Sequence, residues 1–81
     1  MSVPARPAPL FADTFVVENQ RLLKVAHLKL TLRRDASRFE AIYFNHADAA
    51  PPRIRAAYRL AVNEFNGVAS VQLVLEHLEP A

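Results

Sequence analysis

The sequence predicts a small all-β domain, and three observations carry this prediction. Residues 27–33 alternate strictly between leucine and polar residues, which is typical of a strand with one buried face. After a short turn, residues 39–44 form a second run rich in aromatic and β-branched residues. Asn66 and Gly67 then separate two further apolar runs, and this dipeptide predicts a hairpin because a type I′ turn needs positive φ at both positions.

Composition limits the kinds of protein the chain can be. Its 81 residues make one domain, and 52% hydrophobic with 22% charged residues is typical of a globular domain. No apolar run is long enough to span a bilayer, so no membrane contact is expected. The chain has no cysteine, which excludes disulfides and thiolate metal sites and fits a reducing cytoplasm. A net charge of +2 permits nucleic-acid binding without requiring it.

The remaining elements follow in order along the chain. Residues 1–10 are rich in proline and predict an extended linker or tail, so the folded domain is expected over residues 11–79. An apolar run beginning at Phe15 predicts the first strand. Residues 45–52 form a connection too short for more than one helical turn, since Pro51-Pro52 enforces extended backbone.

Residues 53–65 are ambiguous from their pattern alone. Apolar residues recur there at helical spacing, with prolines before them and Asn-Gly after them, which favours a helix. Alternation fits equally well and favours a strand. A strand would bury Leu60 and gather Arg53, Arg55 and Arg59 on its other side, whereas a helix would leave Leu60 off its apolar face.

Four separated blocks of the chain resemble, in order, strands of the oligonucleotide/oligosaccharide-binding (OB) domain of the RecJ family of bacterial single-strand-specific DNA exonucleases. The blocks are residues 27–32, 40–45, 58–67 and 71–77. The resemblance implies a five-stranded Greek-key OB barrel near the C-terminus of the parent protein, with at most a one-turn helix between the third and fourth strands. It also assigns residues 53–62 to a strand. The strands are then expected near residues 14–23, 27–33, 38–45, 53–62 and 68–77.

Two loops depart from the family's usual pattern. The family usually has a glycine between its first two strands, where this chain has Lys24-Val25-Ala26. A second departure is Ala50-Pro51-Pro52, which stands where the family usually has a Gly-Asp turn ahead of the fourth strand. These loops are therefore expected to differ in conformation from those of the family.

The resemblance also implies a site. OB domains bind single strands with a basic groove and stacking aromatic side chains, on the second and third strands and the loops beside them. Six of the ten Lys and Arg residues fall between positions 21 and 38, although an ordinary solvated strand face would look the same. The candidate nucleic-acid-binding residues are Arg21, Lys24, His27, Lys29, Arg33, Arg34, Arg38 and, for base stacking, Phe65. Those expected to contact phosphates are Arg21, Lys24, Lys29, Arg33 and Arg38.

The other aromatic residues are expected in the core, because aromatic burial dominates the stability of small domains. They are Phe15, Phe39, Tyr43, Phe44 and Tyr58.

No catalytic or metal-binding residue is predicted in the chain. The three histidines are far apart in sequence, and His46 with Asp48 is a weak pair that fits a loop histidine better than a ligand set. In the RecJ family, metal ligands in separate DHH-type domains carry out hydrolysis, and those motifs are absent here. The resemblance thus implies a non-catalytic fragment without a cofactor, and a divalent metal such as Mn or Mg in the full-length enzyme.

The expected function is single-stranded-DNA binding within a cytoplasmic 5′–3′ exonuclease of DNA recombination and repair. The expected partners are single-stranded DNA and the catalytic domains of the same parent protein, and the isolated domain is expected to be a monomer. The alternative is a docking module, between domains or between proteins, with little DNA contact. Ile42, Tyr43 and Phe44 favour that alternative because they make the third strand apolar on both faces.

Overall fold

The computed structural model describes residues 9–24 and 26–81, apart from the side chain of Phe65. It contains five strands, which are β1 (Phe11–Leu23), β2 (His27–Arg34), β3 (Ser37–Tyr43), β4 (Arg53–Phe65) and β5 (Val68–Pro80). The all-β, five-stranded prediction is confirmed, and the strand ends differ from the expected ones by at most three residues. Residues 1–8 of the predicted linker lie outside the described residues.

No described residue belongs to a helix. It follows that none of them forms a helix long and apolar enough to cross a membrane. The connection between β3 and β4 is instead irregular, and it is fastened to β1. The Val17 amide donates to the Pro52 carbonyl at 2.8 Å, and the Gln20 side chain exchanges hydrogen bonds with the backbone of Ala50 at 2.7 and 2.9 Å.

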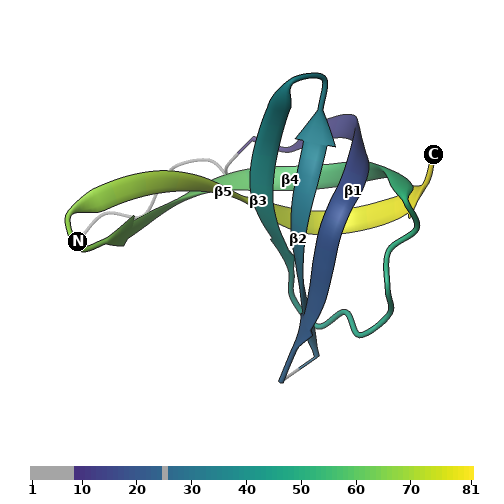
Figure 1. Ribbon diagram of the computed structural model, residues 1–81, viewed down its shortest axis with the longest axis horizontal. Helices are drawn as coiled ribbons and strands as arrows, with labels where there is room; N and C mark the ends of the chain where they lie inside the picture. Colours follow the sequence, from purple (N-terminus) through teal and green to yellow (C-terminus); the bar gives the residue numbers. More distant parts are fainter. Residues whose placement is uncertain (1–8, 25) are drawn as a thin grey trace.

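The five strands close into a barrel in the order β1-β2-β3-β5-β4 (Figure 1). Only β3 and β5 pair in parallel, and the other four neighbouring pairs are antiparallel. Closure gives most backbone groups of the sheet a partner, because a closed barrel has no edge strand.

The segment that was ambiguous is a strand over its whole length. β4 pairs with β1 on one side and with β5 on the other, so tertiary pairing overrides the helical propensity of its alanines. Ile54 and Tyr58 are buried, as the alternation predicts. The expectation that a strand would bury Leu60 is wrong, because its side chain is 50% exposed where β4 runs past the end of the barrel.

The core is built from the inward faces of all five strands. The three leucines of β2 are buried, which confirms their predicted alternation, and Phe15 of β1 packs edge-on against Phe39 and Tyr58 with ring centroids 5.9 and 5.6 Å apart. Phe39 and Tyr43 are half-buried against this core. The prediction that Phe44 is a core residue is wrong, since it follows the end of β3 and is 49% exposed.

A β-bulge in β1 decides which of its residues face outward. Val17 lies opposite Leu32, and Asn19 lies opposite Thr31, so Glu18 is an extra residue without a partner on β2. Because side chains alternate along a strand, one extra residue exchanges the two faces of everything that follows it. The bulge therefore turns Arg21 to the outer surface of the barrel.

Several turns place residues at positive φ, and two of them bear on the sequence predictions. Asn66 and Gly67 have φ of 52° and 78°, which confirms the predicted hairpin turn. Ala26, in the loop where the family usually has glycine, has a φ of 56°. That left-handed conformation suits glycine and is unfavourable for a residue with a Cβ atom.

Candidate nucleic-acid interface

The outer face of β1, β2 and β3 carries most of the predicted site. Residues 29, 31 and 33 of β2 alternate with the buried leucines and therefore point outward. The register of β3 places Glu40 opposite Thr31 and Arg38 opposite Arg33. The cations of two sequence segments thus meet on one curved surface.

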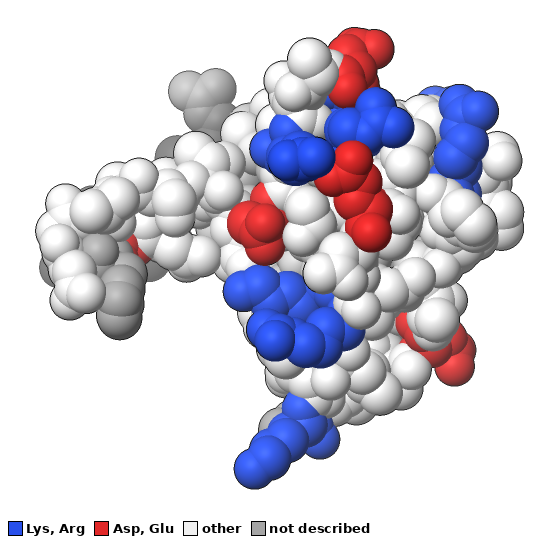
Figure 2. Space-filling model, viewed as in Figure 1, with Lys and Arg blue, Asp and Glu red and all other residues white. Residues whose placement is uncertain are grey.

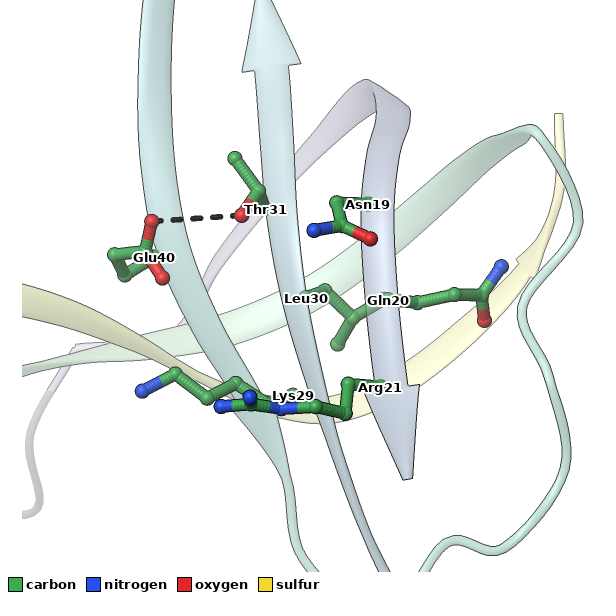
Figure 3. A pocket seen from close by; sticks show the side chains of 7 residues that line it. All are labelled: Asn19, Gln20, Arg21, Lys29, Leu30, Thr31 and Glu40. Carbon is green, nitrogen blue, oxygen red and sulfur yellow. Dashed lines mark hydrogen bonds between the residues drawn. The ribbon is translucent and has the colours of Figure 1, made fainter. Parts of the chain in front are cut away.

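Arg21 and Lys29 lie directly opposite each other across the β1–β2 ladder. Figure 3 shows their side chains side by side at one end of a hollow of about 380 Å³. None of the ion pairs among the described residues involves either of them. Two positive charges held close together without a carboxylate partner favour an anionic ligand. The hollow is lined by Asn19, Gln20, Arg21, Lys29, Leu30, Thr31 and Glu40.

The other cations of this face are compensated by carboxylates. The bulged Glu18 accepts from Arg33 Nε at 2.8 Å and from Arg38 Nε at 2.7 Å. Figure 2 shows the same alternation, with acidic atoms between two of the basic groups on this face. Ion pairs this exposed contribute little to stability, about 0–1 kcal/mol each, but they lower the positive potential offered to a polyanion.

Arg34 is held by a different carboxylate. Its Nη1 lies 2.8 Å from Asp13 Oδ2, and its guanidinium group lies 5.9 and 5.8 Å from the ring centroids of Phe15 and Phe39. Asp13 also accepts a hydrogen bond from the hydroxyl of Tyr58. Burial raises the pKa of Tyr58 above its usual value, and the hydrogen bond to Asp13 adds to the effect. This group therefore joins β1, β2 and β4, and its contacts are those of a structural cluster.

Two pairs of aromatic rings lie near the end of β3. The rings of His27 and Phe44 meet edge to face at 5.0 Å, and the backbone amide of Asn45 donates to His27 Nδ1 at 3.1 Å. Tyr43 stacks on His46 with ring centroids 4.3 Å apart. The half-exposed Phe44 is thus available for stacking, although its place in the sequence predicted a core residue.

The structure brings together only part of the predicted site. Arg21 and Lys29 share the hollow, and His27 lies one outward position further along β2. Lys24 is exposed in the turn that follows β1. The predicted stacking role of Phe65 falls on a side chain outside the described part of the chain. The other three candidates, each in an ion pair, are Arg33, Arg34 and Arg38.

Five lining residues of the hollow were not among the predicted site residues, and they are Asn19, Gln20, Leu30, Thr31 and Glu40. Thr31 and Glu40 are on the outward alternation that contains Lys29, so the polar pattern could have identified them. Their side chains are within 3.5 Å of each other. Asn19 could not be identified in this way, because only the bulge at Glu18 turns it outward.

The described residues do not offer a metal site. Over residues 9–24 and 26–81, no group of three or more His, Asp or Glu side chains is arranged to hold an ion. His46 is instead engaged with the ring of Tyr43. The metal implied for the full-length enzyme therefore does not fit the side chains described here.

A closed five-stranded barrel in the order β1-β2-β3-β5-β4, with a partly cationic outer face on its first three strands, has the architecture of the OB fold. This fold class includes many domains that bind oligonucleotides or oligosaccharides.

The chain belongs to the RecJ OB domain family, whose pattern it matches over residues 4–77. It is similar to the single-stranded-DNA-specific exonucleases RecJ of Dickeya dadantii (37% identical over 94% of this chain), Haemophilus influenzae (34% over 91%) and Escherichia coli (32% over 91%). In each case it spans only 14% of the relative's length.

A solved structure agrees with this assignment. The crystal structure of RecJ in complex with Mn2+ from Thermus thermophilus matches 93% of this chain with a TM-score of 0.75 and 26% sequence identity. The match covers 11% of that protein, so this chain corresponds to a small part of it.

Proposed function

We propose that this chain is a single-stranded-DNA-binding domain of a RecJ-type exonuclease. The observation that carries the proposal is the Arg21–Lys29 pair, two adjacent outward cations without a carboxylate partner among the described residues. The family supports it, because the curated relatives are named as exonucleases specific for single-stranded DNA.

In this proposal the strand crosses the outer face of β1, β2 and β3. Arg21 and Lys29 hold phosphates at the hollow, and Lys24 extends the contact at the nearby turn. Half-exposed Phe44 offers a ring on which a base can stack. Arg33 and Arg38 contribute less to DNA affinity than their charge suggests, because each is paired with Glu18 and a phosphate must compete with that carboxylate.

We propose that this domain positions DNA and that hydrolysis occurs elsewhere in the parent protein. Support comes from the lack of a metal-ligand group among the described residues and from the Mn2+ named in the T. thermophilus structure. The parent would then be a cytoplasmic enzyme of DNA recombination and repair, in which the catalytic domains are the second partner of this one.

The proposal is tested by a fluorescence-anisotropy titration of the 81-residue chain with labelled oligo-dT at several salt concentrations. Contact with about three phosphates predicts a slope of about −2 for log affinity against log salt, since each neutralised phosphate of a single strand contributes about −0.7. The double variant Arg21→Ala/Lys29→Ala should bind about tenfold more weakly, with a slope closer to zero.

The matched control is Arg53→Ala/Arg55→Ala, which removes the same charge from exposed positions of β4. It should change the affinity by less than about twofold. A salt-independent affinity, or equal losses in the two double variants, would contradict the proposal.

A further inference from the structure

The hairpin of β4 and β5 extends beyond the barrel. β4 pairs with β1 only over residues 53–58, and β5 pairs with β3 only over residues 72–74. Beyond residue 58 of β4 and before residue 72 of β5, the two strands pair only with each other among the described residues. Figure 1 shows this hairpin reaching well away from the other three strands. We refer to residues 60–71 as the arm.

One face of the arm is an uncovered continuation of the core. Leu60 lies opposite Leu73, and Val62 lies opposite Val71, so these side chains project to one side of the ladder. Leu73 is 3% exposed inside the barrel. Its three companions further out are 50%, 71% and 57% exposed, in the order Leu60, Val62 and Val71. A two-stranded hairpin with such a face is marginally stable in water unless another surface covers it.

The arm does not suit a polyanion. Glu64 is its only charged residue, and the chain contains no Lys or Arg after Arg59. A strand of DNA would therefore meet aliphatic side chains and one negative charge. An apolar protein surface is the complementary partner, because it would remove these side chains from water.

The family match indicates where that surface belongs. The match over residues 4–77 includes the whole arm, so the arm is part of the domain that the family shares. The chain spans 14% of the length of its curated relatives, so most of each relative lies outside the domain. A partner carried by the same polypeptide is present at high effective concentration and needs only a modest contact area.

We infer that the arm docks, through Leu60, Val62 and Val71, onto an apolar surface of another domain of the same RecJ-type polypeptide. This contact anchors the barrel through the apolar face of the arm, and it leaves the cationic outer face of β1–β3 uncovered. This inference rests on family membership and on the arm, and it does not depend on the proposed DNA contacts.

Hydrogen–deuterium exchange tests the inference in the RecJ-type polypeptide that carries this sequence as its OB domain. Backbone amides of residues 60–71 should exchange at least about tenfold more slowly there than in the 81-residue chain, because docking covers the arm. Val62→Asp should abolish this protection, since it places a charge in the apolar contact. Equal exchange in the two contexts would overturn the inference.

Asn63→Asp is the matched control for Val62→Asp. It introduces the same charge on the adjacent residue of the same strand, but on the opposite face, where Asn63 Nδ2 donates to Gln72 Oε1 at 2.8 Å. Protection should survive in this variant. Loss of protection to the same extent in both variants would show that charge anywhere on the arm disturbs it, and would overturn the assignment to this face.

Two further measurements separate this inference from its rivals. Sedimentation of the 81-residue chain should show a monomer, and a dimer that Val62→Asp dissociates would identify a second copy as the occupant and overturn the inference. Oligo-dT affinity of the 81-residue chain should be unchanged by Val62→Asp. A loss of DNA affinity would place the nucleic acid on the arm instead, whereas failure of the Arg21 and Lys29 variants alone would affect only the proposed function.

Discussion

The outer face of β1–β3 and the arm are made by one continuous sheet, yet their chemistry is opposite. The first carries Arg21, Lys29, Arg33 and Arg38, of which the last two are paired with Glu18. The second has one charge and several exposed aliphatic side chains. Residues within the closed barrel, such as Leu73, are covered by the neighbouring strands. β4 and β5 are longer than the barrel, so the apolar side chains of the arm remain exposed to solvent.

The same comparison can be made within the cationic face. Arg21 and Lys29 have no carboxylate partner among the described residues, while Arg33 and Arg38 share Glu18. The number of cations is therefore a poor measure of the positive potential on this surface. Pairing within the sheet leaves one end of this face with a higher positive potential than the other.

The largest expected effect is on the free energy of unfolding, and it tests where the barrel ends and the arm begins. Leu73 and Leu60 are direct partners across β4 and β5, but they are 3% and 50% exposed. Leu73→Ala should lower the free energy of unfolding by about 3 kcal/mol, because it leaves a cavity in the core. Leu60→Ala should lower it by about 1 kcal/mol or less. Urea denaturation measures both, and equal losses would mean that the barrel interior extends to Leu60.

A second prediction concerns the root of β4, where Tyr58 donates to Asp13. Tyr58→Phe should lower the free energy of unfolding by about 1.5 kcal/mol at neutral pH, since the lost hydrogen bond has a charged acceptor. The folded chain holds the phenol proton more tightly than the unfolded chain, because the pKa of Tyr58 is raised. As pH rises above about 10, the unfolded chain loses this proton first and the wild type loses stability.

The variant has no phenol at this position and should not lose stability in this way. The difference in free energy of unfolding between wild type and variant should therefore narrow as pH rises above about 10. Chemical denaturation at a series of pH values measures the difference. A difference in the free energy of unfolding that stays constant as pH rises above about 10 would contradict a raised pKa of Tyr58 in the folded chain.

A third prediction concerns the carboxylate that Arg33 and Arg38 share. Glu18→Gln should raise the affinity for oligo-dT about threefold and make the salt slope steeper, because two guanidinium groups become available to phosphates. Glu76→Gln is the control, since Glu76 lies 3.5 Å from Arg59, on β5 and β4 rather than on this face. Anisotropy titration measures both variants. Unchanged affinity in Glu18→Gln would mean that this end of the face does not meet DNA.

A fourth prediction compares the tips of two hairpins. The β1–β2 tip has Ala26 at a φ of 56°, whereas the β4–β5 tip has Gly67 at 78°. Ala26→Gly should raise the free energy of unfolding by about 0.5 kcal/mol, and Gly67→Ala should lower it by about 1 kcal/mol. No atom lies within 4 Å of a Cβ added at Gly67, so the second change would report backbone conformation alone. Thermal unfolding measures both changes, and effects of the same sign would contradict this account.

Much of the barrel could be predicted from the sequence. The alternation of β2 and the Asn66-Gly67 turn are local signals, and the structure confirms both. β4 could not be assigned from its own residues, because its apolar positions fit both periods. Only pairing with β1 and β5 distinguishes them, and that pairing is a property of the whole fold.

The candidate site was less predictable. The concentration of cations is visible in the sequence, but their pairing depends on contacts between residues 15 and 20 positions apart, such as Glu18 with Arg33 and Arg38. The outward direction of Arg21 depends on a bulge for which a single sequence has no reliable signal. The exposure of Leu60 also escapes a pattern-based prediction, because alternation says which side a residue takes and not where the barrel ends.

The extra residue in β1 has a consequence for how this surface can be lost. Deleting Glu18 would remove the bulge, so that the inward and outward faces would alternate without interruption along β1. The side chain of Arg21 would then point toward the leucines inside the barrel. Changes of length in this strand are therefore far more damaging than changes of residue type. A one-codon deletion would remove the guanidinium group of Arg21 from the outer surface without changing the arginine to another residue type.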